Sequence, residues 1–388
     1  MPKVITVGLH LGLHYEYNRA ALRGIVSYAR PGKPWVLRLQ PSANIKCDGY
    51  IGNFAKEGSL VDYGAVGKPA VNVSNGYKNT ALPRVGIDDE GAGETVAKYF
   101  HERGFENFAL YDNALQYALE RGEGYGGFLR RHKRDAHVFS AFVRKQGGNT
   151  DDTYEITRRW LLSLPKPIGI FAVNDQIAWT VAEACRDVGL DIPEAVSLVG
   201  IDNDVPVCMM AYPPLSSLAT PGERIGYEAA AMLDRMLAGE KPPEKPLLLP
   251  AKNVITRASS DTLAISDPEL AAAVKFIREN AHERIGVRDV LKAVPLARRS
   301  MERKFRLILG RSPLEEIRRA HIERARELLM NTDMVMPEIA SRSGFESAVR
   351  LTTVFREETG MTPTGFRRQF RMHGGVETDE SMWSGADE

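Results

Sequence analysis

The chain has 388 residues, of which 43% are hydrophobic and 26% charged, so it is long enough for two or three domains and has the balance of a soluble globular protein. No stretch approaches the ~18 consecutive apolar residues that span a membrane, and the first residues lack the apolar run and cleavage site of a signal peptide, so we expect a cytoplasmic protein. Cys47, Cys185 and Cys208 are scattered and form no C-x-x-C pair, so neither a disulfide framework nor a zinc site is indicated, and we expect neither metal nor cofactor.

The charges are unevenly distributed along the chain. Residues 1–268 carry 30 Lys and Arg against 31 Asp and Glu, residues 269–372 carry 21 against 14, and the last sixteen residues carry 0 against 5. A phosphate backbone adds affinity to a basic segment in a salt-dependent way. The pattern favours nucleic acid as a partner of residues 269–372, although charge alone is also typical of a solvated surface.

In the first 250 residues, short β-branched runs alternate with amphipathic stretches. Strands are predicted over residues 4–9, 35–40, 49–51, 70–73, 108–111, 138–143, 168–173 and 197–201. Helices are predicted over residues 18–29, 89–103, 125–132, 152–163, 175–188 and 223–238. Strands that alternate with helices indicate a parallel α/β architecture, and this number of units favours two doubly wound lobes over a single sheet.

Polar residues follow several of these strands directly. Ligands of parallel α/β sheets bind beyond the carboxyl ends of the strands, so such residues are candidates for binding a small molecule. Carboxylates and amides supply the hydrogen bonds that a sugar requires, and an aromatic side chain can cover its apolar face. An alternative role for Asn174, Asp175 or Asp202 is to cap the following helix or turn. The candidates are Tyr15, Glu16, Tyr17, Asp88, Asp89, Arg121, Asn174, Asp175, Gln176, Asp202 and Asn203.

The segments A-V-N-D-Q-I-A (residues 172–178) and V-G-I-D-N (residues 199–203) resemble the effector-binding domain of the LacI/GalR family, which is related to periplasmic sugar-binding proteins. The resemblance covers residues 3–258 and implies that Asn174, Gln176 and Asp202 contact the effector. It also implies an effector-binding Arg three residues before a glycine-aromatic pair. With Gly127-Phe128 as that pair, Gly124 occupies the position, and Arg121 is the candidate substitute.

Beyond a linker predicted at residues 259–267, where Ser, Thr and Asp cluster, the pattern is helical only. Helices are predicted over residues 287–293, 297–309 and 314–330. A further short helix leads into a turn at Ser343-Gly344-Phe345, and the helix after it ends at Gly360. Short helix, tight turn and second helix form a helix-turn-helix pattern.

This unit is duplicated. Phe305-Arg306, Gly310 and Pro313 recur fifty residues later as Phe355-Arg356, Gly360 and Pro363. The second helix of each copy places polar or small side chains on the face opposite its apolar stripe, where they could enter a major groove. These DNA-binding candidates are Arg298, Arg299, Glu302 and Arg303 in the first copy and Ser347, Val349, Arg350 and Thr353 in the second.

Two such units joined by one long helix resemble the DNA-binding domain of the AraC/XylS family of transcription regulators. The resemblance covers residues 268–372 and rests on an I-A-x-x-x-G-F turn followed by F-R-x-x-T-G-M-T-P-x-x-F-R-R. It implies that the two recognition helices enter successive segments of the major groove on one face of the duplex. It does not identify the bases that they contact.

A LacI-like domain that lacks its usual helix-turn-helix and precedes an AraC-type domain resembles the arrangement of the bacterial xylose-operon regulators. The resemblance implies a sugar effector, D-xylose, together with operator DNA, a homodimer and, for an activator, RNA polymerase as partners. The domains expected are an effector domain (residues 1–258), a linker (259–267), a DNA-binding domain (268–372) and a disordered tail (373–388), which is rich in Gly, Ser and acidic residues.

Other patterns were weighed. Gly122, Gly124 and Gly127 satisfy G-x-G-x-x-G, but they do not follow a strand directly, which argues against a dinucleotide site. His10 and His14 lack a nearby third metal ligand. The acids Asp88-Asp89 and Asp202 with Asp204 leave open a carbohydrate-active enzyme with an accessory nucleic-acid-binding domain, although no nucleophile or metal site accompanies them.

Overall fold

The computed structural model describes residues 4–30, 32–42, 44–54, 67–76, 82–140, 150–262, 264–265 and 267–370. The chain forms two compact units, Met1–Ile265 and Ser266–Glu388. We call them the N-terminal and C-terminal units. The tail expected at residues 373–388 lies outside the described residues.

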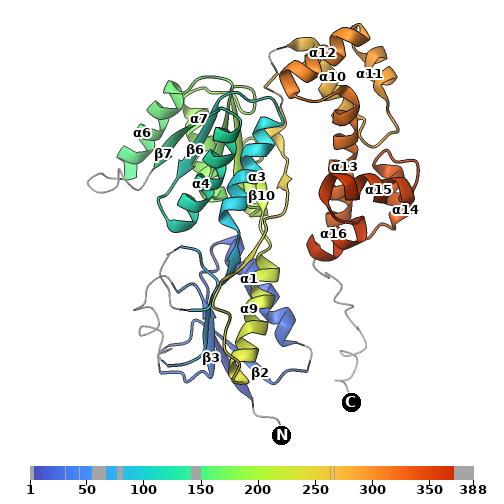
Figure 1. Cartoon of the computed structure of the whole chain (residues 1–388). Helices are drawn as coiled ribbons and strands as arrows, with labels where there is room; N and C mark the ends of the chain where they lie inside the picture. Colours follow the sequence, from blue (N-terminus) through green and yellow to red (C-terminus); the bar gives the residue numbers. More distant parts are fainter. Residues whose placement is uncertain are drawn as a thin grey trace, which may run out of the picture. The chain divides into compact units, whose positions relative to one another are not determined.

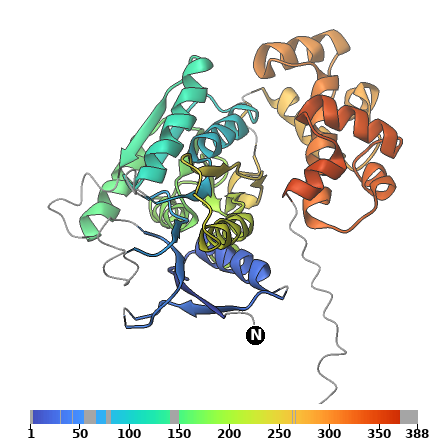
Figure 2. The ribbon, with the colours of Figure 1, turned by 60° about the horizontal axis from the view of Figure 1, so that its bottom comes forward.

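The first lobe of the N-terminal unit is built on a parallel sheet with strand order β2-β1-β3-β4 (Figure 1). Helices α1 and α9 pack against each other on this lobe, as the blue and olive helices of Figure 2 show. The element bounds are β1 Ile5–His10, α1 Glu16–Ala29, β2 Trp35–Leu39, β3 Gly49–Gly52, β4 Ala70–Asn72 and α9 Gly222–Leu237.

The second lobe contains a larger sheet with strand order β12-β10-β9-β8-β6-β7, in which only β12 is antiparallel to its neighbour. Its strands are largely buried, as expected for a parallel sheet covered by helices. The strands are β6 Phe108–Asp112, β7 Ala136–Ser140, β8 Ile168–Ala172, β9 Val196–Asp202, β10 Ser216–Ala219 and β12 Val254–Ile255. The helices are α3 Asp89–His101, α4 Gln116–Arg131, α6 Thr150–Ser163, α7 Asp175–Asp187 and α8 Val205–Met210.

The chain passes between the lobes more than once. Strand β5 (Val85–Ile87) leads from the first lobe into α3 and pairs in parallel with β11 (Leu247–Leu249), which leads from α9 back toward β12. The segment from β10 to α9 makes another crossing. Several short connections of this kind allow two lobes to move relative to each other as rigid bodies.

In each lobe one helix pair packs closely because a glycine of each helix lies against the backbone of the other helix. A Cβ atom on Gly24 of α1 would lie 1.8 Å from the carbonyl oxygen of Glu223, and one on Gly226 of α9 would lie 1.9 Å from that of Ala21. Pair α3–α4 repeats this arrangement at Gly93 and Gly124. Any side chain at these positions would force the helices apart.

The C-terminal unit is entirely helical in its described part, and α13 joins two helix-turn-helix units, α11–α12 and α14–α15 (Figure 1). Gly310 and Gly360 end α12 and α15 in the left-handed conformation, with φ of +68° and +73°. The helices are α10 Pro268–Glu279, α11 Val287–Ala293, α12 Arg298–Leu309, α13 Pro313–Asn331, α14 Met336–Arg342, α15 Ala348–Thr359 and α16 Pro363–Phe370.

The predicted architecture, a two-lobed parallel α/β domain followed by an all-α domain with two helix-turn-helix units, is confirmed. Two local predictions need correction. The helix predicted over residues 125–132 begins earlier, because α4 runs from Gln116 to Arg131; its glycines lower helix propensity and hid its first two turns from the sequence pattern. Ser259 and Ser260, expected in a linker, are buried in the N-terminal unit.

Among the described residues, no helix is both long and apolar enough to cross a membrane. Within the same part of the chain, no group of three His, Cys, Asp or Glu side chains is placed to hold a metal ion. All three cysteines are buried and form no disulfide.

Candidate effector site and DNA-binding surface

Six side chains from both lobes, three of them buried and three half-buried, form a polar group beyond the carboxyl ends of β6, β8 and β9. We call it the polar cluster. Tyr17 comes from α1 in the first lobe, whereas α3, α4, the β8–α7 connection and the end of β9 supply the others. Charge interactions connect Tyr17 and Arg121 with the same two carboxylates, Asp89 and Asp202. The members are Tyr17, Asp89, Tyr117, Arg121, Asn174 and Asp202.

Arg121 is the cationic centre of the polar cluster. It is only 4% exposed, and its Nε donates a hydrogen bond of 2.7 Å to Oδ1 of Asp89, which is 2% exposed. Its Nη1 donates to the carbonyl oxygen of Val173, and its guanidinium lies 4.7 Å from the centre of the Tyr117 ring. A buried arginine held by a carboxylate, a carbonyl and an aromatic face has a fixed orientation, which suits the recognition of a ligand's oxygen atoms.

The glycine-aromatic pair that follows this arginine is Gly124-Tyr125. Arg121 stands three residues before it, which is the spacing that the LacI/GalR resemblance implies. Gly124 packs against the carbonyl oxygen of Glu90 with no room for a side chain, and Tyr125 is fully buried, whereas the nearest atoms to a Cβ on Gly127 are 3.7 Å away. Helix α4 thus contains two glycine-aromatic pairs, Gly124-Tyr125 and Gly127-Phe128, and the first of them has an arginine three residues before it.

Asp202 ends β9 in an unusual backbone conformation. Its φ is +112° and that of Asn203 is +54°, values that non-glycine residues rarely adopt. The Oδ1 atom of Asp202 is buried and has no hydrogen-bond partner among the described residues. Burial raises the pKa of this carboxyl to about 8, while the positive charge of Arg121 opposes the shift. Strained conformations of this kind persist where the surroundings impose them, and they concentrate at functional sites.

Two tyrosines and an asparagine complete the polar cluster. The Tyr17 hydroxyl donates to the carbonyl oxygen of Val73 at 2.8 Å, and burial together with Asp89 and Asp202 raises its pKa. Asn174 uses Oδ1 to cap α7 through the amide of Ile177 at 2.8 Å, and its Nδ2 donates to the Tyr117 hydroxyl at 3.4 Å. Asn174 thus fills both roles considered from the sequence, helix cap and member of a polar site.

Tyr117 is a member of the polar cluster that was not predicted from the sequence. Its hydroxyl also accepts a hydrogen bond from Asn113, which follows β6 directly. The rule that ligands bind at strand ends selects Asn113, and the tyrosine four residues later would be a natural partner once α4 is known to begin at Gln116.

Four other candidates have structural partners. Asp175 accepts hydrogen bonds from Ser217 Oγ at 2.6 Å and the Asp204 amide at 2.7 Å, and burial raises its pKa to about 7. Asp88 caps α3 through the Gly91 amide at 3.0 Å. Glu16 and Asn203 are bound by arginines: Glu16 by Arg19 and Arg23, and Asn203 by Arg257.

The last two effector candidates, Tyr15 and Gln176, are more exposed than the buried members of the polar cluster. Tyr15 is 39% exposed, and its ring lies 4.0 Å from the ring of His14. Gln176 is half-buried in the first turn of α7. The glycines of the G-x-G-x-x-G pattern lie inside α4, so they do not form the loop that a dinucleotide phosphate needs.

In the C-terminal unit, the DNA-binding candidates form two exposed faces. All four candidates of α12 are exposed, and Arg298 forms an ion pair of 3.1 Å with Glu302 one turn later. On α15, Val349 is 77% exposed and Arg350 is also exposed, while Ser347 caps the helix through the Arg350 amide at 3.2 Å. The Thr353 hydroxyl donates to the carbonyl oxygen of Val349 at 3.1 Å.

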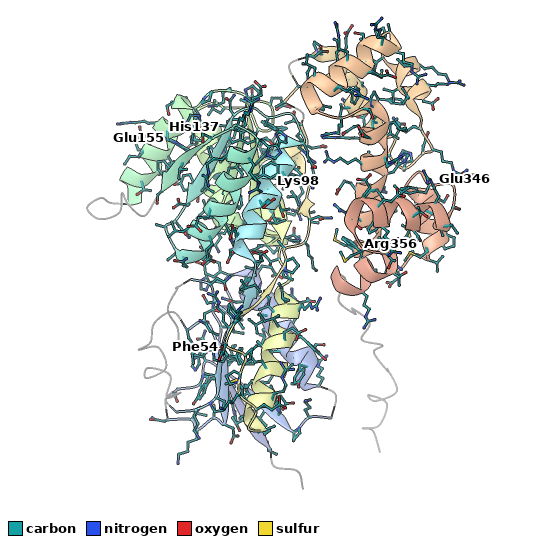
Figure 3. The ribbon with its side chains drawn as sticks, viewed as in Figure 1. Phe54, Lys98, His137, Glu155, Glu346 and Arg356 are labelled. Carbon is teal, nitrogen blue, oxygen red and sulfur yellow. The ribbon has the colours of Figure 1, made fainter. Side chains whose placement is uncertain are left out.

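The two helix-turn-helix units are also connected beside α13. His321 of α13 contacts the carbonyl oxygen of Glu283 through Nε2 at 3.1 Å, and a Cβ on Gly344 would lie 2.4 Å from the same Nε2 atom. Arg284 donates to the carbonyl oxygen of Glu346, labelled in Figure 3, at 3.1 Å. The loop before α11 is thereby held against the turn before α15. These contacts limit the rotation of one helix-turn-helix unit relative to the other.

Two known domain families match the two parts of the chain separately, and several known proteins match both parts together. Residues 97–260 match a periplasmic binding protein-like domain, and residues 290–369 match a helix-turn-helix domain. The xylose operon regulatory protein of Haemophilus influenzae is 27% identical over 380 residues, which cover 93% of this chain and 97% of that protein. Its counterpart in Escherichia coli K12 is 26% identical over 369 residues, 90% of this chain and 94% of the relative.

A solved structure described as a xylose-binding transcription activator covers 96% of this chain and 100% of its own, with a TM-score of 0.61 and 25% identity. This chain is a DNA-binding transcription regulator of the same two-domain kind. The regulator joins a periplasmic-binding-protein-like domain to a helix-turn-helix domain, as the sequence resemblances implied. The relatives that match along its length are regulators, and no finding supports the enzyme alternative.

Proposed function

We propose that a sugar, D-xylose, binds at the polar cluster and controls the affinity of the regulator for its operator. The observation that carries the proposal is the buried Arg121, held among carboxylates, amides and tyrosines that both lobes supply. Hydroxyl groups of a pentose can donate to Asp89 and Asp202 and accept from Arg121 and Asn174. The similarity to xylose operon regulatory proteins along nearly the whole chain supports the choice of sugar.

The control follows from differential affinity. Tyr17 lies on one lobe and the remaining members of the polar cluster on the other, so a bound sugar stabilises the arrangement that brings them together. The sugar shifts the population of the regulator toward the DNA-competent state only to the extent that it binds this state more tightly. A regulator that binds chromosomal DNA in this way acts in the cytoplasm.

We further propose that the regulator acts as a homodimer and as an activator that recruits RNA polymerase. The support is the resemblance to the xylose-operon regulators and the activator among the similar solved structures. Light scattering after size-exclusion chromatography tests the dimer. Transcription from a bound promoter with purified polymerase, with and without sugar, tests activation.

Isothermal titration with D-xylose, L-arabinose, D-ribose and D-glucose tests the effector. D-xylose is expected to bind most tightly, and Arg121→Lys is expected to lower its affinity at least tenfold, because lysine cannot keep the orientation of the planar guanidinium. The matched control is Arg131→Ala, which removes an exposed arginine of the same helix that pairs with Glu94. No binding of any of the four sugars, or equal binding by Arg121→Lys, would contradict the proposal.

A further inference from the structure

Three consecutive residues at the end of β9 contact three different parts of the N-terminal unit. Asp202 belongs to the polar cluster. Asn203 accepts a hydrogen bond of 2.7 Å from Nη2 of Arg257. Asp204, only 4% exposed, forms an ion pair with Arg19 of α1 in the first lobe, with 2.8 Å between Oδ2 of Asp204 and Nη2 of Arg19. We call residues 202–204 the junction turn.

Arg257 belongs to the last stretch of the N-terminal unit, residues 254–262, which we call the exit segment because it leads toward the C-terminal unit. The side chain of Arg257 is held at both ends. Its Nη1 donates to the carbonyl oxygen of Leu215 at 2.8 Å, and its backbone amide donates to Ser216 Oγ at 2.7 Å. Because these hydrogen bonds restrict the Arg257 side chain, a movement of Asn203 is expected to displace the Arg257 backbone as well.

The exit segment is attached along its length to the second lobe. Strand β12 pairs with β10, with Ile255 opposite Ser217. Ser259 Oγ donates to the carbonyl oxygen of Leu198 in β9 at 2.7 Å and accepts from the Ser216 amide at 2.8 Å. Ser260 Oγ lies 2.6 Å from the Tyr99 hydroxyl of α3. The segment thus follows β9, β10 and α3 when the second lobe moves.

Hydrogen bonds from the backbone amides of the junction turn to neighbouring side chains fix its shape. The amide of Asn203 donates to Ser217 Oγ at 2.9 Å, and Ser217 Oγ donates in turn to Asp175. Asp175 also holds the amide of Asp204. With its amides bound to buried groups and two of its residues at positive φ, the junction turn has few alternative conformations, so a change at Asp202 or Asp204 is passed to Asn203.

From this geometry we infer that Arg257 is a positioning residue that couples the effector site to the exit segment. The inference rests on the proposed function, because the signal originates where the sugar meets Asp202 and where Arg19 joins the lobes at Asp204. The hydrogen bond from Arg257 to Asn203 transmits a displacement of the junction turn to the backbone of residues 254–262. Arg257 itself does not touch the sugar.

The test compares sugar binding with sugar response in the full-length protein. The coupling factor is the ratio of operator affinities with and without saturating D-xylose, measured on DNA selected from a random pool for binding to the protein. Arg257→Ala is expected to lower the coupling factor at least fivefold while the D-xylose affinity changes by less than threefold, since coupling of this kind spans about 5- to 150-fold. Arg131→Ala is the control, because it removes an exposed arginine that pairs with Glu94 rather than with the junction turn. It is expected to keep the full coupling factor.

Two variants at the partner residue separate coupling from mere folding. Asn203→Ala is expected to lower the coupling factor as Arg257→Ala does, and the double variant to be no worse than either alone, because both remove the same hydrogen bond. Asn203→Asp keeps an oxygen that can accept from Arg257 and is expected to restore the coupling factor. An unchanged coupling factor in Arg257→Ala, a parallel loss of sugar affinity, or additive losses in the double variant would overturn the inference.

Hydrogen exchange distinguishes this inference from the proposed function. Without any sugar, Asn203→Ala is expected to speed amide exchange at residues 254–262 relative to the parent protein, because the segment loses one of its attachments. If no sugar binds the parent protein, the proposed effector is wrong, and the exchange result still decides whether the Arg257 contact holds the exit segment. Unchanged exchange in Asn203→Ala would overturn the inference whichever ligand is the effector.

Discussion

At the scale of single residues, Asp202 combines a buried oxygen, a positive φ and a carboxyl whose pKa is raised to about 8. In the unfolded chain the same carboxyl has a pKa near the ordinary value of about 3.9. Between about pH 4 and pH 8 the unfolded chain therefore loses a proton that the folded chain keeps. The contribution of this group to stability is fully present below about pH 4 and is lost as the pH rises through about 8.

Asp202→Asn, which is neutral at every pH, is expected to remove this loss. The melting temperature of the N-terminal unit should exceed that of the parent protein by a few degrees at pH 8.5, and the difference should shrink toward pH 4. Thermal unfolding followed by circular dichroism from pH 4 to pH 9 measures it. Asp261→Asn, at an exposed aspartate, serves as the control, and a difference that does not grow with pH would contradict the assignment.

At the scale of secondary structure, the glycines of α4 differ sharply in their surroundings. Gly124→Ala would place a Cβ atom 1.9 Å from the carbonyl oxygen of Glu90, so α3 and α4 must separate and Arg121 must move with its helix. We expect a loss of about 1–3 kcal/mol in the free energy of unfolding and a weaker affinity for D-xylose. Chemical denaturation and calorimetric titration measure the two effects.

Gly127→Ala is the matched control on the same helix. The nearest atoms lie 3.7 Å from the new Cβ, and alanine favours a helix interior over glycine by about 0.5–1 kcal/mol. Gly127→Ala is therefore expected to be neutral or stabilising and to leave sugar binding intact. Equal effects of the two substitutions would show that the α3–α4 contact does not depend on Gly124.

Elements with strong local signals could be predicted from the sequence. The helices α11 to α15 of the C-terminal unit followed from apolar stripes, glycine stop signals and a fifty-residue repeat, and α11 was predicted with its observed bounds. No bounds were predicted for the helices α10 and α16. The short strands β5, β10, β11 and β12 were missed, whereas β3 and β4, which are of similar length, were predicted; two to four residues carry so little periodicity that such strands are detected only in some cases. The start of α4 was missed because its helical state depends on packing against α3, which composition does not reveal.

The polar cluster could be predicted only in part. The rule for strand ends selected Asn174 and Asp202, and the family resemblance raised Arg121 as a substitute. The rule could not separate side chains that belong to the polar cluster from those, such as Asp88 and Glu16, that are bound by a helix end or by neighbouring arginines. That distinction depends on which way each side chain points, and the spacing of residues in the sequence does not determine it.

At the scale of the whole molecule, the helices α12 and α15 each carry exposed arginines that are candidates for binding DNA. Arg303→Ala on α12 and Arg350→Ala on α15 are each expected to lower the affinity for the cognate operator by about 1–3 kcal/mol and to have little effect on random DNA, if they contact bases. Their losses should add within about 0.5 kcal/mol, because the two arginines belong to different helices, α12 and α15, of different helix-turn-helix units. Neither should change the coupling factor.

Fluorescence anisotropy at fixed salt measures these affinities, and the salt must be fixed because phosphate contacts depend on it. Lys275→Ala, at an exposed lysine of α10 that lies 3.8 Å from Glu279, is the control for general loss of positive charge. Equal losses on operator and random DNA would instead identify the arginines as phosphate contacts.

The attachment of the exit segment also determines where this regulator can be joined to other proteins. Residues 254–262 are hydrogen-bonded into β9, β10 and α3, and the compact N-terminal unit continues to Ile265. A biosensor made by grafting a different ligand-binding domain onto this helix-turn-helix domain should therefore exchange everything through Ile265. A junction placed at residue 258 would leave the buried Ser259 and Ser260 facing a foreign sheet, with their hydroxyl groups deprived of the partners that β9, β10 and α3 now supply.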